Sequence, residues 1–103
     1  MKDLTLYESI FLLAISRLDN NAYGVAIREE VSQVMQRTIS YGTLYSYLDQ
    51  IFRKGYVTKT IGDPTPERGG RRKIFYKLTL DGRKALRTSY KLQKAIWAGV
   101  SEL

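Results

Sequence analysis

The 103-residue sequence contains no cysteine and no histidine, and only two prolines. Without cysteine the chain can form neither disulfides nor thiolate metal sites, and it has no cysteine nucleophile. Without histidine it lacks the commonest general base and the commonest metal ligand. No phosphate-loop motif is present, and the carboxylates are scattered rather than clustered. We therefore expect a protein that is not an enzyme and that has no metal site and no cofactor.

Long apolar runs are also missing. No stretch approaches the roughly 18 uncharged apolar residues of a membrane-spanning helix, and residues 1–11 lack the basic start and apolar run of a signal peptide. Hydrophobic residues make up 44% of the chain, which is ordinary for a globular domain. These features predict one cytoplasmic domain with no membrane partner.

The net charge of +7 is distributed unevenly. Residues 1–36 carry three basic and five acidic side chains, a net charge of −2, whereas residues 37–103 carry 14 basic and five acidic ones, a net charge of +9. A basic half of this kind indicates a polyanionic partner such as nucleic acid. A solvated basic surface is the alternative interpretation of the same composition.

A capping box formed by Thr5 and Glu8 predicts a first helix that runs to about Arg17. This helix is apolar almost all round, with Phe11 on it. Such a helix must be covered on more than one side. Because the chain is short, we expect a second copy of the protein to supply part of the cover.

A second helix is predicted for Tyr23–Met35, with an apolar stripe and a polar face. Arg28 falls on the polar face. Gly24, near the start, permits the close approach of another backbone or of a phosphate.

The segment Ser40–Gly55 predicts a third helix, with Ser40 as its N-cap and Gly55 at its exit. At 100° per residue its large apolar side chains fall on one side and its small polar ones on the other. The predicted buried side comprises Tyr41, Leu44, Leu48, Ile51 and Phe52, and the outward side comprises Gly42, Thr43, Ser46, Asp49, Gln50 and Arg53. Small polar residues at an exposed helix start let a helix approach another surface closely.

Two alternating segments, Tyr56–Ile61 and Lys73–Leu80, predict strands on either side of a polar loop at Gly62–Arg72. Three helices followed by a strand, a loop and a strand form a winged helix-turn-helix. The expected fold class is therefore mainly α with a small β-hairpin (α+β).

A final helix, capped by Thr79 and running from about Asp81 to the end, carries more apolar surface than an isolated helix can expose. Pairing with the first helix, of the same or another subunit, would cover it. We expect residues 1–80 to form the DNA-binding domain and residues 81–103 a dimerisation helix, within one compact unit.

Several short motifs occur in a fixed order along roughly residues 4–90. They are Tyr23-Gly24, Gly42-Thr43-Leu44-Tyr45, Leu48, Arg53-Lys54-Gly55-Tyr56-Val57, Gly69-Gly70-Arg71-Arg72-Lys73, Tyr76-Lys77-Leu78-Thr79 and Gly82. In this order and spacing they resemble the PadR-like family of transcriptional regulators. The resemblance implies a homodimeric repressor that dimerises through its first and last helices, of the short subgroup with one C-terminal helix. It also implies a response to small aromatic or cationic effectors.

The predicted contacts with double-stranded DNA come from the recognition helix (about 40–54), the wing (about 62–73) and the start of the second helix. The candidate residues are Tyr23, Ser40, Thr43, Tyr45, Ser46, Gln50, Arg68, Arg71, Arg72 and Lys73. Thr43, Ser46 and Gln50 are placed to reach base edges in the major groove. Ser40 and Tyr45 are better placed for phosphates, with help from the helix N-terminal amides.

Structural alternatives stand beside these assignments. Ser40 serves equally well as a pure cap, and Tyr23 and Tyr45 as partly buried core residues. For Tyr41 and Tyr47 the core interpretation is favoured. The charged wing is alternatively a solvated hairpin.

Tyr90 and Trp97 lie seven residues apart on one stripe of the last helix. Together with Phe11 they are the candidates for an aromatic ligand slot at the dimer interface. The alternative is that they form the core of that interface.

The sequence thus predicts a homodimeric repressor that binds a pseudo-palindromic operator, with half-sites about 10 bp or a multiple apart. A small ligand at the dimer interface would relieve repression. The alternative function is a winged-helix protein-interaction module without direct DNA readout. The basic half and the arginine-rich wing argue against that alternative, because protein interfaces are usually more apolar at their centre.

Overall fold

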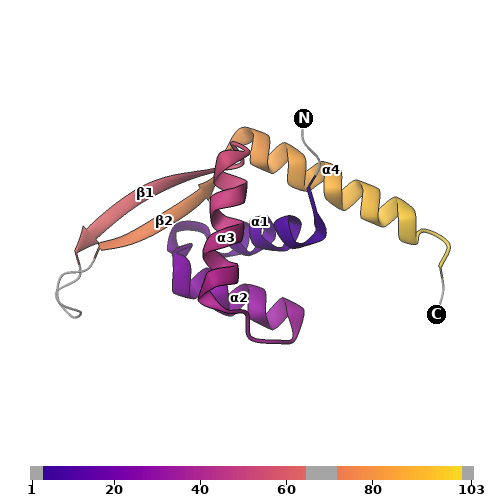
Figure 1. The fold of residues 1–103 in the computed structure, drawn as a ribbon. Coiled ribbons are helices and arrows are strands. Elements are labelled where there is room, and N and C mark those ends of the chain that lie inside the picture. Colours follow the sequence, from indigo (N-terminus) through magenta and orange to yellow (C-terminus); the bar gives the residue numbers. More distant parts are fainter. Residues whose placement is uncertain (1–3, 65–71, 101–103) are drawn as a thin grey trace.

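The computed structural model describes residues 4–64 and 72–100 (Figure 1). Within these residues the chain forms helices and one antiparallel hairpin, in the order that the sequence patterns predict. The helical elements are α1 (Leu6–Leu18), the short 3-10 helix η1 (Asp19–Asn21), α2 (Gly24–Met35), α3 (Tyr41–Arg53) and α4 (Leu80–Trp97), and the strands are β1 (Val57–Pro64) and β2 (Arg72–Leu78). The predicted fold class, mainly α with a small β-hairpin, is confirmed.

Three hydroxyl side chains begin three of the helices, as predicted. Thr5 accepts a hydrogen bond from the backbone amide of Glu8 at 3.2 Å, and Glu8 in return accepts one from the amide of Thr5 at 2.8 Å. Ser40 and Thr79 each accept a hydrogen bond at 3.0 Å from the backbone amide three residues further on. These bonds satisfy amides that have no partner inside the helix.

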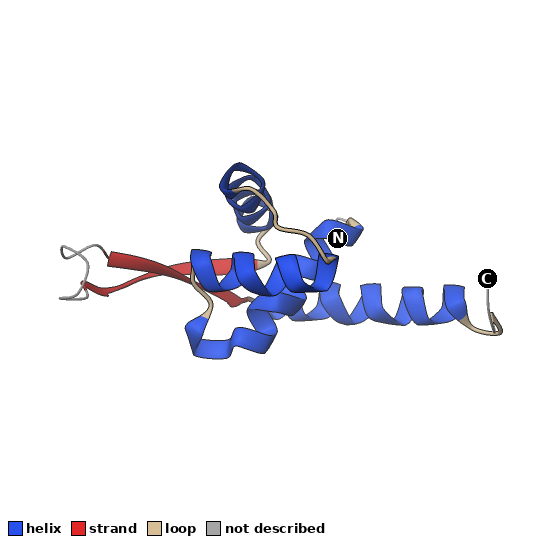
Figure 2. Cartoon of the chain, turned by 90° about the horizontal axis from the view of Figure 1, so that it is seen from below, coloured by secondary structure: helices blue, strands red, loops and turns tan. Residues whose placement is uncertain are grey.

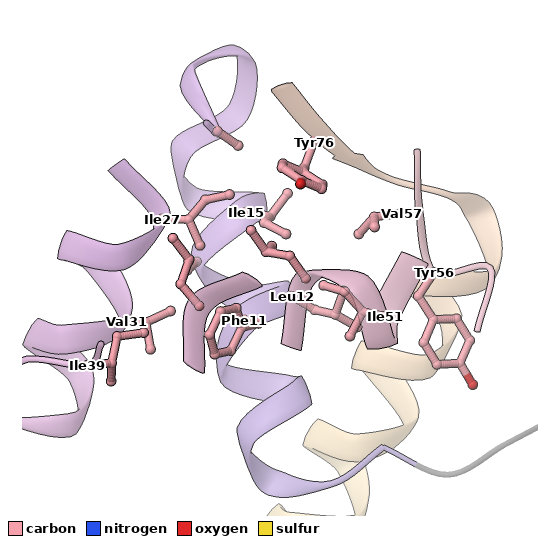
Figure 3. Close-up of a cluster of buried hydrophobic side chains, with 14 of the residues drawn as sticks. Phe11, Leu12, Ile15, Ile27, Val31, Ile39, Ile51, Tyr56, Val57 and Tyr76 are labelled. Carbon is pink, nitrogen blue, oxygen red and sulfur yellow. The ribbon is translucent and has the colours of Figure 1, made fainter. Parts of the chain in front are cut away.

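The hydrophobic core forms where α1 meets α2, α3 and the base of the hairpin (Figure 3). Its buried members include Phe11, Leu12, Ile15, Ile27, Val31, Ile39, Leu44, Leu48, Ile51, Tyr56, Val57 and Tyr76. Burying one large aliphatic or aromatic side chain stabilises a fold by about 1.5–3 kcal/mol. The core therefore holds α3 by its inner side, which carries Leu44, Leu48 and Ile51, and does not cover the outward side of the helix.

The hairpin is attached to the helical body at its base. Its register runs from Val57 opposite Leu78 to Ile61 opposite Ile74, with an irregularity before Pro64. The amide of Tyr76 donates to the carbonyl of Ala22 at 2.8 Å, which joins β2 to the segment between η1 and α2. The hairpin therefore leaves the body in a direction set by its contact with the start of α2.

Gly82 allows α4 to start close to the hairpin. A Cβ atom at this buried position would overlap the backbone carbonyl of Tyr56. The amide of Thr79 donates to the same carbonyl at 3.0 Å. Glycine is thus required here by the close approach of two backbone segments.

The molecule is elongated, with principal extents of 53 × 29 × 21 Å. The hairpin and α4 project from opposite sides of the helical body (Figure 2). All residues from 91 to 100 are exposed, so the last turns of α4 make little contact with the rest of the chain. Among the described helices, none is long and apolar enough to cross a bilayer.

Candidate nucleic-acid interface

α3 lies across the helical body in front of α1, with α2 at its start and the hairpin leaving from its end (Figure 1). Leu44, Leu48 and Ile51 are buried, which confirms the centre of the predicted inner side. The prediction that Tyr41 and Phe52 are buried is wrong, because they are 48% and 41% exposed. Both lie at the margin of the inner side, where the cationic ends of Arg28 and Lys59 lie over the rings of Tyr41 and Phe52.

The first two turns of α3 present a small polar surface. Ser40 and Thr43 share two contacts of 3.0 Å, one from the Thr43 amide to the Ser40 hydroxyl and one between the two hydroxyls. The cap role of Ser40 is therefore confirmed. Gly42 and Ser46 are exposed, and a Cβ atom on Gly42 would meet only the Ser40 hydroxyl, at 3.8 Å. This surface could approach another molecule closely.

Tyr45 lies along the flank of α3 and is 51% exposed, so it is not a core residue. Its ring reaches the start of α2, where a Cβ atom on Gly24 would come within 2.8 Å of the Tyr45 hydroxyl. The close approach that Gly24 permits is thus made by a side chain of the same protein. Burial, together with the nearby Tyr45 and Asp49, raises the pKa of Tyr76 on β2. The flank of α3 is therefore adjacent to the hairpin.

Gln50 does not face outward, and the prediction of its orientation is wrong. Its side-chain amide donates a hydrogen bond of 2.6 Å to a carboxylate oxygen of Glu8 on α1. The helical angle of Gln50 places it at the edge between the outward face and α1. The buried carboxylate then turns the side chain inward.

Glu8 is fully buried and links α1 to the end of α3. Besides the amide of Thr5 and the side chain of Gln50, its carboxylate binds the ammonium of Lys54 at 2.7 and 2.8 Å. Burial alone would raise the pKa of Glu8, but the hydrogen bonds from Lys54, Thr5 and Gln50 outweigh it, so the pKa lies below the usual value. The sequence showed only the cap function of Glu8, because its distant partners follow no local pattern.

Carboxylates neutralise several of the cations near α3. Arg53, on the outward face, pairs with Asp49 one turn earlier at 3.0 Å. Arg17, in the last turn of α1, pairs with Glu30 of α2 at 3.6 Å. The outward face of α3 therefore contributes no net positive charge of its own.

The sequence patterns place Arg28 on the polar face of the second helix. In the structure its side chain lies against the turn before α3. Its Nε–H donates to the carbonyl of Ile39 at 2.7 Å, and its guanidinium carbon lies 4.2 Å from the centre of the Tyr41 ring. The amide of Ile39 donates to the hydroxyl of Ser32, also on α2, at 3.1 Å. No spacing rule in the sequence would have revealed this set of contacts.

The base of the wing is described in part. Lys73 on β2 holds its ammonium 4.2 Å from the centre of the Tyr23 ring, and this ring meets Phe75 edge-on at 5.8 Å. Tyr23 is thus half-buried between α2 and the hairpin, consistent with its core alternative. Arg68 and Arg71 lie outside the described residues, and for Arg72 only the backbone at the start of β2 is described.

The predicted ligand residues separate into two groups. Phe11 is fully buried and stacks on Tyr47 at 5.3 Å, so its assignment to an interface or ligand site is wrong. The same stacking confirms Tyr47 as a partly buried core residue. Tyr90 and Trp97 are 63% and 55% exposed on α4.

A groove of about 700 Å³ runs between α1 and α4. Apolar side chains dominate its lining, and Tyr90 lies along it, whereas Trp97 does not contribute. Its main apolar residues are Leu6, Ile10, Leu13, Leu78, Leu86 and Tyr90. The groove therefore lies between the two helices through which the sequence predicts dimerisation.

Solved structures of other proteins share the fold described above. RosR of H. salinarum is 25% identical, with a TM-score of 0.73 over 97% of this chain and 83% of that one. A PadR family regulator from Eggerthella lenta (22% identical, TM-score 0.68, 89% and 78% covered) and a transcriptional regulator from Clostridium thermocellum (21% identical, TM-score 0.68, 93% and 90% covered) share the fold. No curated protein matches the chain.

The family model described as "Transcriptional regulator PadR-like family" matches residues 12–88. This segment includes the second half of α1, all of α2, α3 and the hairpin, and the first half of α4. The family model describes transcriptional regulators, and two of the structural relatives are named as such, in agreement with the prediction that the chain is not an enzyme. The chain therefore belongs to the PadR-like family of DNA-binding transcriptional regulators, as its ordered motifs predicted.

Proposed function

We propose that the protein is a homodimeric transcriptional repressor that binds a pseudo-palindromic DNA site. The observation that carries this proposal is the exposed small polar surface at the start of α3, on a helix anchored by the buried Leu44 and Leu48. An anchored helix with such a surface can enter a major groove about 12 Å wide. Thr43 and Ser46 would then read base edges, and Ser40 and Tyr45 would bind phosphates.

The wing would supply much of the affinity. Because Asp49 neutralises Arg53, attraction to phosphate must come from residues outside the outward face of α3. Arg68, Arg71, Arg72 and Lys73 remain the predicted wing contacts, with Tyr23 supporting Lys73 at the wing base. Gln50 is left out of the proposed interface, because Glu8 binds its side chain.

The proposed dimer forms through α1 and α4. Leu6, Tyr90, Leu92, Ile96 and Trp97 are each at least 55% exposed, and an apolar surface on a projecting helix usually marks an interface. A second copy of α4 seated in the groove between α1 and α4 would cover it. Two-fold symmetry of the protein would match the symmetry of the operator. Tyr90 and Trp97 are also the proposed site for a small aromatic or cationic effector that would relieve repression.

Selection of bound duplexes from a random library, followed by mobility shifts at two salt concentrations, tests this function. We expect a pseudo-palindromic site and binding that weakens steeply with salt. Ser46→Glu should abolish specific binding, whereas Gln33→Glu, which makes the same charge change on exposed α2 surface, should not. Failure to select any site, with no binding at low salt, would favour the protein-interaction module instead.

A further inference from the structure

We infer that Arg28 and Lys59 are phosphate-contacting residues, one at each end of α3. Neither residue was a candidate from the sequence, and neither belongs to the predicted set of wing arginines. The inference rests on the proposed function, because it specifies further contacts of the same DNA interface.

Aromatic rings of α3 hold both cations in place. The guanidinium carbon of Arg28 lies 4.2 Å from the centre of the Tyr41 ring, and the ammonium of Lys59 lies 4.3 Å from the centre of the Phe52 ring. Cations are attracted to ring faces within about 6 Å. The two rings thus fix two long, otherwise mobile side chains beside the helix.

A ring positions a cation without neutralising it. Arg53, Lys54 and Arg17 instead contact carboxylates, which cancel their charge. Within the described part of the chain, no ion pair joins Arg28 or Lys59 to an acidic side chain. Around α3 these two residues, together with Lys73, therefore keep a net positive charge that a phosphate could neutralise.

The positions of the two cations suit the two sides of a groove. Tyr41 and Phe52 are separated by three turns of α3 plus about 20°, so they lie on one flank, about 16 Å apart along the helix axis. Tyr45, on the same flank, is also half-exposed. A major groove about 12 Å wide separates two phosphate backbones. A helix entering it would bring Arg28 toward one backbone and Lys59 toward the other.

The geometry of Arg28 leaves suitable donors. Its Nε–H is used by the carbonyl of Ile39, and the terminal amino groups make no hydrogen bond within the described residues. A guanidinium carries five donors in a rigid planar fork, which matches the oxygens of a phosphate. The bond to Ile39 thus orients the fork, and the outer edge of the fork can bind DNA.

The test measures binding to a short random-sequence duplex, because a phosphate contact is independent of base sequence. Fluorescence anisotropy between about 50 and 200 mM salt gives the slope of log K against log salt. The variants are Arg28→Gln and Lys59→Met, and the control is Arg17→Gln, which removes the same charge from a carboxylate-paired arginine. Thermal unfolding of each variant establishes that it is folded.

Each variant should bind more weakly than the wild type, and its slope should be shallower by about 0.9 per cation lost, or about 1.8 per dimer. The control should keep the wild-type slope. Tyr41→Leu and Phe52→Leu, which remove the ring and retain the cation, should keep the slope while lowering the affinity. Because Lys59 and Phe52 are exposed, their variants should fold even if Arg28→Gln does not.

Two results would overturn the inference in different ways. If the wild type binds DNA but Lys59→Met and a folded Arg28→Gln keep the control slope, the phosphate contacts are wrong and the proposed function stands. If the wild type does not bind any duplex at the lowest salt, the proposed function fails and the inference fails with it.

Discussion

The ammonium of Lys54, at the end of α3, lies 2.7 Å from a carboxylate oxygen of Glu8 in the first turn of α1. The carboxylate is fully buried, and it also accepts hydrogen bonds from Thr5 and Gln50. One acidic side chain therefore completes the N-cap of α1 and attaches the C-terminal end of α3 to it. The orientation of the proposed recognition helix depends on this ion pair as well as on apolar packing.

Replacing Glu8 by glutamine should destabilise the protein strongly. Removing one partner of a buried ion pair leaves the other charge without compensation, which typically costs about 3–5 kcal/mol. Urea unfolding of Glu8→Gln should therefore give a free energy of unfolding about 3 kcal/mol below wild type. The matched control is Glu29→Gln on exposed α2 surface, which should change stability little. Equal stability of the two variants would contradict the structural role of Glu8.

The stability of the protein should fall at acidic pH in a way that depends on Glu8. Its pKa is lowered on folding, so the unfolded chain binds the proton more tightly. The contribution of Glu8 is thus fully present above the unfolded pKa of about 4.3 and is lost as the pH falls through the folded pKa. Unfolding measured from about pH 2.5 to 7 should show a difference between wild type and Glu8→Gln that narrows below about pH 4. A difference in stability between the two proteins that stays the same at every pH would show that the ionised form of Glu8 does not stabilise the fold.

Gly42→Ala should separate stability from DNA binding. The position is helical and exposed, and a Cβ atom there meets only the Ser40 hydroxyl at 3.8 Å. Alanine should therefore raise the free energy of unfolding by about 0.5 kcal/mol. The added methyl group would stand where α3 approaches DNA most closely, so affinity for the selected site should fall severalfold. Gln33→Ala on α2 should leave affinity unchanged, and a Gly42→Ala variant with full affinity would place the contact elsewhere.

The only tryptophan can report dimerisation without DNA. Trp97 is 55% exposed in the single chain, so a dimer formed through α4 should bury it and shift its emission to shorter wavelength as concentration rises. Ile96→Glu should prevent the shift and give a monomer in sedimentation. Lys84→Gln, with the same charge change on α4, should not. A wild type that stays monomeric at all concentrations would rule out the proposed interface.

Features set by neighbouring residues were predictable from the sequence. The caps at Thr5, Ser40 and Thr79 depend on bonds that span three residues, and the alternation in the strands predicts the hairpin directly. The inner side of α3 followed from helical periodicity at Leu44 and Leu48, where burial is complete.

Contacts between distant segments were not predictable in this way. Periodicity cannot tell a buried centre from a margin, so Phe52 was misplaced, and Phe11 could be assigned to the surface as easily as to the core. Gln50 turns inward because it donates a hydrogen bond to Glu8. Glu8 lies 42 residues earlier in the chain, so no local pattern predicts this contact. The position of the Arg28 side chain depends on the carbonyl of Ile39 and the ring of Tyr41, and sequence spacing does not show which ring a cation will contact.

Ile39 is the buried residue of the turn between α2 and α3. Side chains of α2 bond both of its backbone polar groups, Ser32 accepting from the amide and Arg28 donating to the carbonyl. α3 therefore cannot tilt away from α2 without losing two hydrogen bonds and exposing an isoleucine. As a result, the two helices should fluctuate as one cooperative unit, and local opening should begin elsewhere in the chain.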